Sequence, residues 1–160
     1  MKLSEAMRER MLLSFELFPP KTEKGMDNLP GTIDHLMKYK PAYISCTYGA
    51  GGGNVGANRE VCQMIKKAGT TPVTHFTVIK NTKEGIKEQL DQYLAEGVDH
   101  MLALRGDIPL GETTTCGDFN YATDLVKFVR DEFGDKFEIA VAGSRRGTLH
   151  AAALMLILQF

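Results

Sequence analysis

Short apolar runs recur along the chain and predict five buried strands. Each run is rich in β-branched and aromatic residues and is bounded by glycine, proline or polar clusters. The expected strands are Leu12–Phe18, Ala42–Thr47, Pro72–Val78, Val98–Leu104 and Phe137–Ala142.

Between these runs, apolar residues repeat every three to four positions, which predicts four helices that each bury one face. Gly69 and Gly97 each follow the polar end of such a pattern, where a left-handed residue commonly ends a helix. The apolar faces comprise Ile33, Leu36 and Met37; Val61, Met64, Ile65 and Ala68; Ile86, Leu90, Tyr93 and Leu94; and Leu125, Val126, Val129 and Phe133.

Strands and helices therefore alternate, an order typical of right-handed βαβ units and a parallel sheet in an α/β protein. The pattern alone is compatible with a Rossmann-like open sheet and with half of a (β/α)8 barrel. A complete barrel takes roughly 200 to 250 residues or more. A chain of 160 residues would therefore hold only part of one.

Composition is that of a soluble globular protein, with 43% hydrophobic and 24% charged residues. A net charge of -1 gives no overall attraction for nucleic acid or anionic membranes. The most apolar stretch, Leu149–Phe160, is about half as long as a membrane span, and the N-terminus lacks a signal-peptide pattern.

The three cysteines, Cys46, Cys62 and Cys116, show no C-x-x-C spacing. This pattern disfavours disulfides and a zinc site and fits a reducing cytoplasm.

The first strand carries a carboxylate, Glu16, among apolar residues just before the strand-breaking pair Pro19 and Pro20. In a βα barrel, residues at this end of a strand face the active site. We expect such a carboxylate to be desolvated, which raises its pKa into the range of a general acid. The alternative is a glutamate that points to solvent or pairs with a lysine.

The next three strand ends also carry candidate binding residues. A glycine-rich run, 49–54, follows the second strand without a P-loop or clean dinucleotide pattern, so it is either a close-approach loop or an ordinary turn. His75 alternates with threonines in the third strand, where a core histidine is the alternative. Arg105 and Asp107 flank Gly106 after the fourth strand and could simply pair with each other.

Taken in order, five segments resemble the bacterial type of methylenetetrahydrofolate reductase. They are F-E-L-F-P-P-K-T, S-C-T-Y-G-A-G-G, T-H-F-T, A-L-R-G-D-I-P and Y-A-T-D-L-V, within about residues 10 to 143. The resemblance implies a partial (β/α)8 TIM barrel with about strands one to five and four helices. It also implies an oxidoreductase that uses FAD and NADH or NADPH to reduce 5,10-methylenetetrahydrofolate to 5-methyltetrahydrofolate in one-carbon and methionine metabolism.

The resemblance also assigns roles to residues. Glu16 matches the general acid that protonates N10 of the folate, and Asp107 matches the aspartate whose charge stabilises the cationic iminium and disfavours the anionic reduced flavin. It implies no metal, a folate substrate, a cytoplasmic location and homo-oligomeric full-length members. Tyr121 would be a packing residue by periodicity alone, but the family match places it with the residues that hold FAD: Thr47, Tyr48, His75, Leu104, Arg105, Gly106, Asp107, Tyr121 and Ala122.

The chain departs from the family after Gly143. Family members continue with a segment resembling Tyr-Pro-Glu-Gly-His, whereas this chain has Arg145–His150. One chosen set of permitted codons for Ser144–Phe160, read two bases later, would encode Pro-Glu-Gly-His-Ile-Ala-Arg-Gly-Ser-Phe-Asp-Ala-Asp-Ile-Ala-Ile. We therefore expect a family part over residues 1–143 and a frameshifted tail over 144–160, with a genuine divergent terminus as the alternative.

The apolar residues of this tail fall at near-helical spacing, so a helix could cover part of an open barrel edge. The tail positions with this spacing are Leu149, Ala152, Ala153, Leu156 and Phe160.

Two functional interpretations follow from the sequence. The chain is either a representative of the enzyme or a truncated, non-catalytic fragment with weak or no FAD binding.

Overall fold

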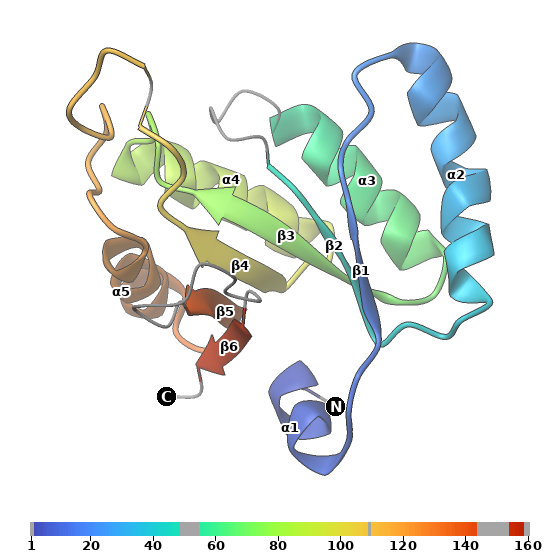
Figure 1. Ribbon diagram of the computed structural model, residues 1–160. Coiled ribbons are helices and arrows are strands. Elements are labelled where there is room, and N and C mark those ends of the chain that lie inside the picture. Colours follow the sequence, from blue (N-terminus) through green and yellow to red (C-terminus); the bar gives the residue numbers. More distant parts are fainter. Residues whose placement is uncertain (1, 49–54, 109, 144–153, 159–160) are drawn as a thin grey trace, which may run out of the picture.

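The computed structural model, which describes residues 2–48, 55–108, 110–143 and 154–158, contains one six-stranded sheet in the order β1-β2-β3-β4-β5-β6 (Figure 1). Strands and helices alternate from β1 to β5, as the sequence predicts. The strands are β1 (Ser14–Leu17), β2 (Tyr43–Cys46), β3 (Thr71–Thr77), β4 (His100–Leu104), β5 (Glu138–Gly143) and β6 (Leu154–Leu158). The helices are α1 (Leu3–Glu9), α2 (Glu23–Met37), α3 (Val55–Lys67), α4 (Lys83–Ala95) and α5 (Ala122–Phe133).

Strands β1 to β5 pair in parallel, each with the next one along the chain. In a βα barrel, each parallel strand pairs with the next strand along the chain, and a helix joins the two. An open Rossmann-like sheet instead reverses its strand order at one point. The fold class is thereby confirmed as a partial (β/α)8 barrel. Gly69 and Gly97, which follow α3 and α4, have φ values of 94° and 70°, as expected for residues that end helices.

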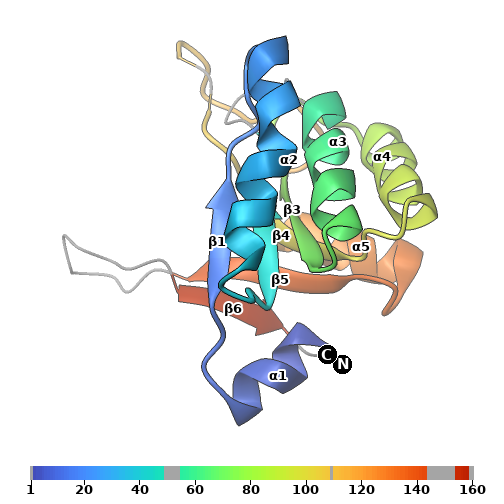
Figure 2. The ribbon, with the colours of Figure 1, turned by 90° about the vertical axis from the view of Figure 1, so that its right-hand side faces the viewer.

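The main hydrophobic core lies between the sheet and the helices α2 to α5, which cover one face of it (Figure 2). Ile44 of β2, Phe76 of β3 and Met101 of β4 belong to this core and are at most 1% exposed. The alternate positions of the same strands, such as Tyr43 and Val73, face the other way and pack against α1. In a closed barrel this second face is the interior.

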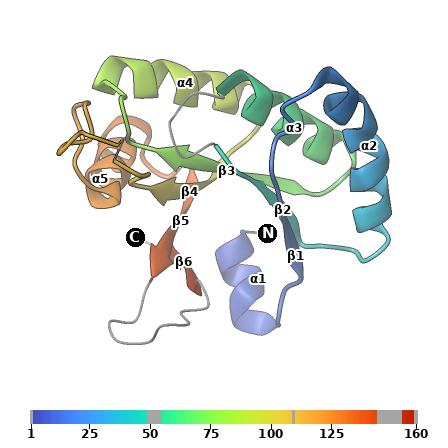
Figure 3. The same cartoon turned by 45° about the horizontal axis from the view of Figure 1, so that its top comes forward.

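Helix α1 was not predicted, since residues 1–9 show a charged and polar pattern without a clear apolar face. It lies on the opposite side of the sheet from α2, α3 and α4 (Figure 3). Leu3 packs there against Tyr43 and Val73. The carboxylate of Glu138 accepts hydrogen bonds from the backbone N–H groups of Leu3 and Ser4, at 2.9 and 2.6 Å. These contacts cross more than 130 residues of sequence, so no local pattern could indicate them.

The tail also differs from its expected conformation. Residues Leu154–Leu158 form strand β6, which pairs antiparallel with β5. The helix predicted from the apolar spacing is therefore wrong for this segment. An exposed edge of a sheet offers unpaired backbone groups to any extended segment nearby, and this pairing satisfies them. The glycine-rich run at 49–54 and the tail residues 144–153 lie outside the described residues.

Candidate functional site

A pocket of about 430 Å³ lies at the carboxyl ends of β2, β3 and β4. Carboxyl ends of parallel strands meet at one edge of the sheet, so residues far apart in sequence are gathered there. Seven of the nine residues proposed to hold a cofactor contribute to its lining. The lining consists of Phe18, Thr47, Tyr48, His75, Thr77, Leu104, Arg105, Gly106 and Asp107.

Two of the predicted site residues at this end of the sheet, Glu16 and His75, contact each other. Nε2 of His75 lies 3.4 Å from Oε2 of Glu16. Burial lowers the pKa of His75, and the opposing charge of Glu16 offsets only part of this effect. The Glu16 side chain is 49% exposed, so the strong desolvation expected from the sequence is wrong for this chain. Its partner is a histidine, not the lysine considered as an alternative.

The end of β2 is fixed by a buried asparagine on α3. Nδ2 of Asn58 donates to the backbone carbonyls of Cys46 and Thr47, each at 3.0 Å, and Asn58 is fully buried. Its Oδ1 accepts from the hydroxyls of Thr74 and Tyr93 at 2.8 and 2.7 Å. Asn58 therefore provides the hydrogen-bond donor for the two carbonyls at the end of β2 and holds Thr47 at the pocket.

Tyr48 contributes to the pocket wall but is also a core residue, with 1% of its surface exposed. Its hydroxyl donates to Oε1 of Gln89 on α4 at 2.5 Å, and its ring lies 5.2 Å from that of Phe76. Burial raises the pKa of Tyr48 to about 12, although a hydrogen bond with Asn81 lowers it in part. At neutral pH this side chain therefore serves as an uncharged wall.

The end of β4 turns sharply at Gly106, which has a φ of 83°. A Cβ atom at this position would lie 2.6 Å from Cγ1 of Ile79 and 3.1 Å from Cβ of Thr77, so the backbone approaches β3 more closely than another residue allows. Nε of Arg105 donates to the Gly106 carbonyl at 3.2 Å. Arg105 and Asp107 form no ion pair within the described part of the chain, which leaves both charges available to a ligand.

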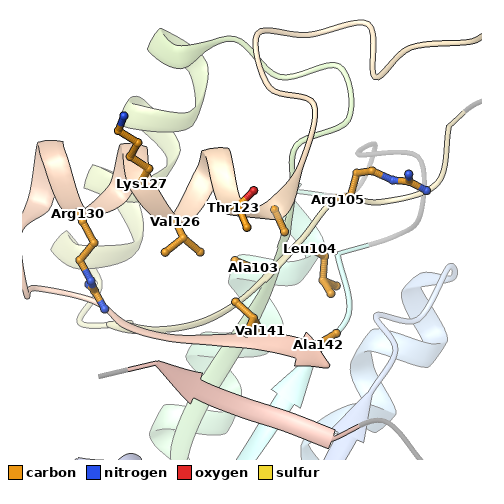
Figure 4. A pocket seen from close by; sticks show the side chains of 10 residues that line it. Ala103, Leu104, Arg105, Thr123, Val126, Lys127, Arg130, Val141 and Ala142 are labelled. Atoms are coloured by element: carbon orange, nitrogen blue, oxygen red, sulfur yellow. The ribbon is translucent and has the colours of Figure 1, made fainter. Parts of the chain in front are cut away.

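A second cavity, of about 1000 Å³, lies between β4, β5 and α5 and shares Leu104 and Arg105 with the strand-end pocket. Figure 4 shows Val126 of α5 facing Ala103 and Val141 across it, while the charged groups of Arg105 and Lys127 point away from its centre. The walls are therefore mainly apolar, with basic groups around them.

Two further predicted cofactor residues lie at the start of α5. Ala122 lines the larger cavity. Tyr121 lies at the N-cap of α5, is 62% exposed and lines neither cavity. The structure thus places Ala122, but not the Tyr121 side chain, beside the candidate site.

The lining includes two residues that sequence reasoning missed, Phe18 and Thr77. Each lies two positions beyond a predicted site residue, Glu16 or His75, and residues two apart in a strand share a face. That spacing was the signal that could have indicated them. The described residues contain no group of three or more potential metal ligands and no helix long and apolar enough to span a membrane.

Comparison with known proteins gives one family. The family model described as "Methylenetetrahydrofolate reductase" matches residues 2–154, past Gly143, where the motifs noted in the sequence end. The chain is 37% identical over 147 residues to a probable methylenetetrahydrofolate reductase (NADH) of Oryza sativa subsp. japonica. It is 36% identical over 137 residues to the 5,10-methylenetetrahydrofolate reductase of Pectobacterium carotovorum and 36% identical over 131 residues to that of Escherichia coli.

These alignments cover most of this chain but only part of each relative. They include 89% of this chain and 25% of the rice protein. For the bacterial proteins they include 85% and 81% of this chain, but 44% and 43% of the Pectobacterium and Escherichia proteins. The chain thus spans less than half the length of the relatives it matches.

Proposed function

Because this chain belongs to the methylenetetrahydrofolate reductase family, we propose that it forms the flavin-holding part of an enzyme that reduces 5,10-methylenetetrahydrofolate to 5-methyltetrahydrofolate. The observation that carries this proposal is the contact between Glu16 and His75, a residue that lines the strand-end pocket. A proton donor beside a largely apolar binding site is what reduction of a methylene bridge requires, since a nitrogen must be protonated as the bridge opens.

The residues present fit a flavin. A pocket of about 430 Å³ lies within the size range of small-molecule sites, and its lining combines apolar side chains with polar and charged ones. Thr77 supplies a buried hydroxyl, and Thr47 and His75 supply further polar atoms from adjacent strands. The larger cavity beside α5 adjoins it through Leu104 and Arg105, which supports an extended ligand such as FAD over a compact one.

When bound, FAD would supply the hydride chemistry between a reduced nicotinamide and the folate. In its protonated form, the Glu16 carboxyl would donate a proton to N10 of the folate substrate and become a carboxylate. His75 holds the Glu16 carboxyl at the pocket edge, and its lowered pKa keeps the imidazole largely neutral. Asp107 places a negative charge at the pocket, where it stabilises a cationic iminium form of the substrate.

The hydride donor is proposed to be NADH, since the rice and Arabidopsis relatives carry NADH in their names. We further propose a cytoplasmic role in one-carbon and methionine metabolism, with homo-oligomeric assembly of the full-length protein. A steady-state comparison of NADH and NADPH oxidation by a full-length protein with this N-terminal part would test the choice of donor.

The direct test is flavin binding by the 160-residue chain. We expect the purified chain to quench the fluorescence of added FAD in a saturable manner and to retain a flavin absorbance band after gel filtration. Substituting Arg105→Ala and Asp107→Asn should weaken binding, whereas Glu132→Gln on the far side of α5 should not. Absence of saturable binding by the wild-type chain would contradict the proposal.

A non-catalytic fragment is the second candidate, and one observation favours it. Strand β5 is followed in the sheet by the antiparallel β6, not by a sixth parallel strand. Five parallel strands supply only part of the ring of strand ends on which a barrel enzyme builds its site. Weak or absent FAD binding by the 160-residue chain would support this second candidate.

A further inference from the structure

The strand-end pocket contains a buried hydroxyl without a hydrogen-bond partner. Oγ1 of Thr77 is fully buried and pairs with no other described group, and the whole residue is 4% exposed. A buried polar atom left unpaired costs about 1 to 3 kcal/mol, so native structures seldom retain one without a reason. Thr77 also lines the pocket, and rotation about its Cα–Cβ bond would turn the hydroxyl toward a ligand placed there.

Comparison with other buried polar atoms shows that this state is unusual in the described part of the chain. The hydroxyl of Thr74, three residues earlier on the same strand, donates to Oδ1 of Asn58 at 2.8 Å. The hydroxyl of Thr115 donates to the carbonyl of Phe119. Nε2 of His100 also lacks a well-directed hydrogen bond, but it lies 2.9 Å from the carboxylate of Glu138. Thr77 has neither kind of partner.

The position of Thr77 restricts the shape of the ligand that it can contact. Thr77 follows His75 by two residues on β3, so their side chains share a face about 7 Å apart, given a rise of about 3.3 Å per residue. Gly106 packs against Thr77 from β4, and the nearby walls at Leu104 and Phe18 are apolar. A flat heteroaromatic ring system with a polar edge suits this arrangement.

We propose that the Thr77 hydroxyl hydrogen-bonds to the carbonyl-bearing pyrimidine edge of the flavin ring and thereby helps to select this cofactor. The inference rests on the proposed function, because it assumes a flavin in the strand-end pocket. It adds Thr77 to the residues suggested by the sequence motifs. Thr77 acts as a binding and specificity residue and takes no part in proton transfer.

The experiment compares Thr77→Val with Thr77→Ser in the full 160-residue chain. Valine keeps the shape of threonine and removes the hydroxyl, whereas serine keeps the hydroxyl. FAD is titrated against each protein and followed by fluorescence quenching, and the thermal midpoint of each protein without FAD is measured. We expect Thr77→Val to bind FAD about tenfold more weakly, the loss typical of one hydrogen bond, and Thr77→Ser to bind within about threefold of wild type.

The stability measurement distinguishes a ligand contact from a structural one. A hydroxyl that has no partner in the folded chain can be replaced by an apolar isostere without loss, so Thr77→Val without FAD should unfold at the same temperature as wild type or higher. A clear drop in its midpoint would reveal a structural partner and overturn the inference.

A ring-only probe tests where on the ligand the contact lies. Riboflavin carries the flavin ring without the phosphates and adenine, so Thr77→Val should weaken riboflavin and FAD binding by the same factor. Equal binding by wild type and Thr77→Val, or a loss confined to FAD, would overturn the inference alone. Failure of wild type to bind either flavin would overturn the proposed function and this inference together.

Discussion

Nε2 of His75 lies 3.4 Å from Oε2 of Glu16, across the intervening strand β2. The imidazole is almost fully buried, whereas the carboxylate is half-exposed. The two residues are separated by most of two βα units in sequence, and only the parallel sheet brings them together. This contact gives each residue a measurable influence on the other.

Replacing Glu16 by glutamine should lower the pKa of His75 further. Burial already lowers this pKa, and the negative charge of Glu16 raises it in part, so removing the charge removes the only opposing effect identified. The pKa can be measured by NMR titration of the imidazole ring protons. Glu132→Gln, which changes a carboxylate paired with Lys87, serves as the control and should leave His75 unchanged. A higher pKa for His75 in Glu16→Gln would contradict the assigned contact.

Gly106→Ala should destabilise the chain more than Gly111→Ala. Both glycines have positive φ, at 83° and 89°, so alanine carries a similar backbone penalty of about 1 kcal/mol at each. Only Gly106 has close neighbours, since its new Cβ would meet Ile79 and Thr77 while that of Gly111 would meet nothing within 4 Å. The difference should be about 1 to 3 kcal/mol in urea unfolding. Equal losses would show that the turn relaxes freely.

Asn58→Ala should cost about 3 kcal/mol or more of unfolding free energy. The substitution removes the donor to the carbonyls of Cys46 and Thr47 and the acceptor of the Tyr93 hydroxyl, and each buried group left unpaired costs about 1 to 3 kcal/mol. The Thr74 hydroxyl keeps the His75 carbonyl as an acceptor. Asn120→Ala, at an exposed position, is the matched control and should change stability by less than about 0.5 kcal/mol. Urea denaturation followed by circular dichroism measures both. A loss below about 1 kcal/mol for Asn58→Ala would contradict the role of this side chain.

Glu138→Gln should loosen α1 from the sheet. Burial acts to raise the pKa of Glu138, but hydrogen bonds from Ser4 and Leu3 and the charge of His100 outweigh it, and the pKa lies below its ordinary value of 4.5. We expect a loss of about 1 to 3 kcal/mol at neutral pH, with faster hydrogen exchange at the amides of Leu3 and Ser4.

The pH dependence of that loss has a definite sign. A carboxyl with a lowered folded-state pKa stabilises the fold above its unfolded-state pKa, and this contribution disappears as the pH falls through the lower folded-state value. The stability difference between wild type and Glu138→Gln should therefore shrink as the pH falls below about 4.5. A difference that grows on acidification would contradict the assigned hydrogen bonds.

The 160-residue chain should show little or no methylenetetrahydrofolate reductase turnover even with added FAD. Catalysis requires the reacting atoms to be held in a narrow geometry, and the described sheet supplies five of the eight parallel strands of a closed barrel. Purified chain, FAD, NADH and methylenetetrahydrofolate provide the assay, with a full-length relative as the positive control. Turnover close to that of the relative would overturn this expectation.

Local sequence patterns predicted the strands β1 to β5 and the helices α2 to α5, because helix and strand periodicities are properties of short segments. They also predicted that polar residues at successive strand ends would share one edge of the sheet, and Thr47, His75 and Asp107 do so. The assigned roles of these residues remain predictions. The 62% exposure of Tyr121 and the half-exposed carboxylate of Glu16 could not be predicted, since exposure depends on which other segments cover a residue.

The amino-acid order alone thus specified an alternating α/β chain, its parallel sheet and the family to which its motifs belong. Tertiary structure decided the contacts between distant segments: Glu16 with His75, Asn58 with the end of β2, and Glu138 with α1. It also decided that Leu154–Leu158 pairs as a strand and that the Thr77 hydroxyl lacks a partner among the described residues. The physical reason is that backbone and side-chain hydrogen bonds are satisfied by whichever groups the fold brings near, and sequence spacing carries no record of those neighbours.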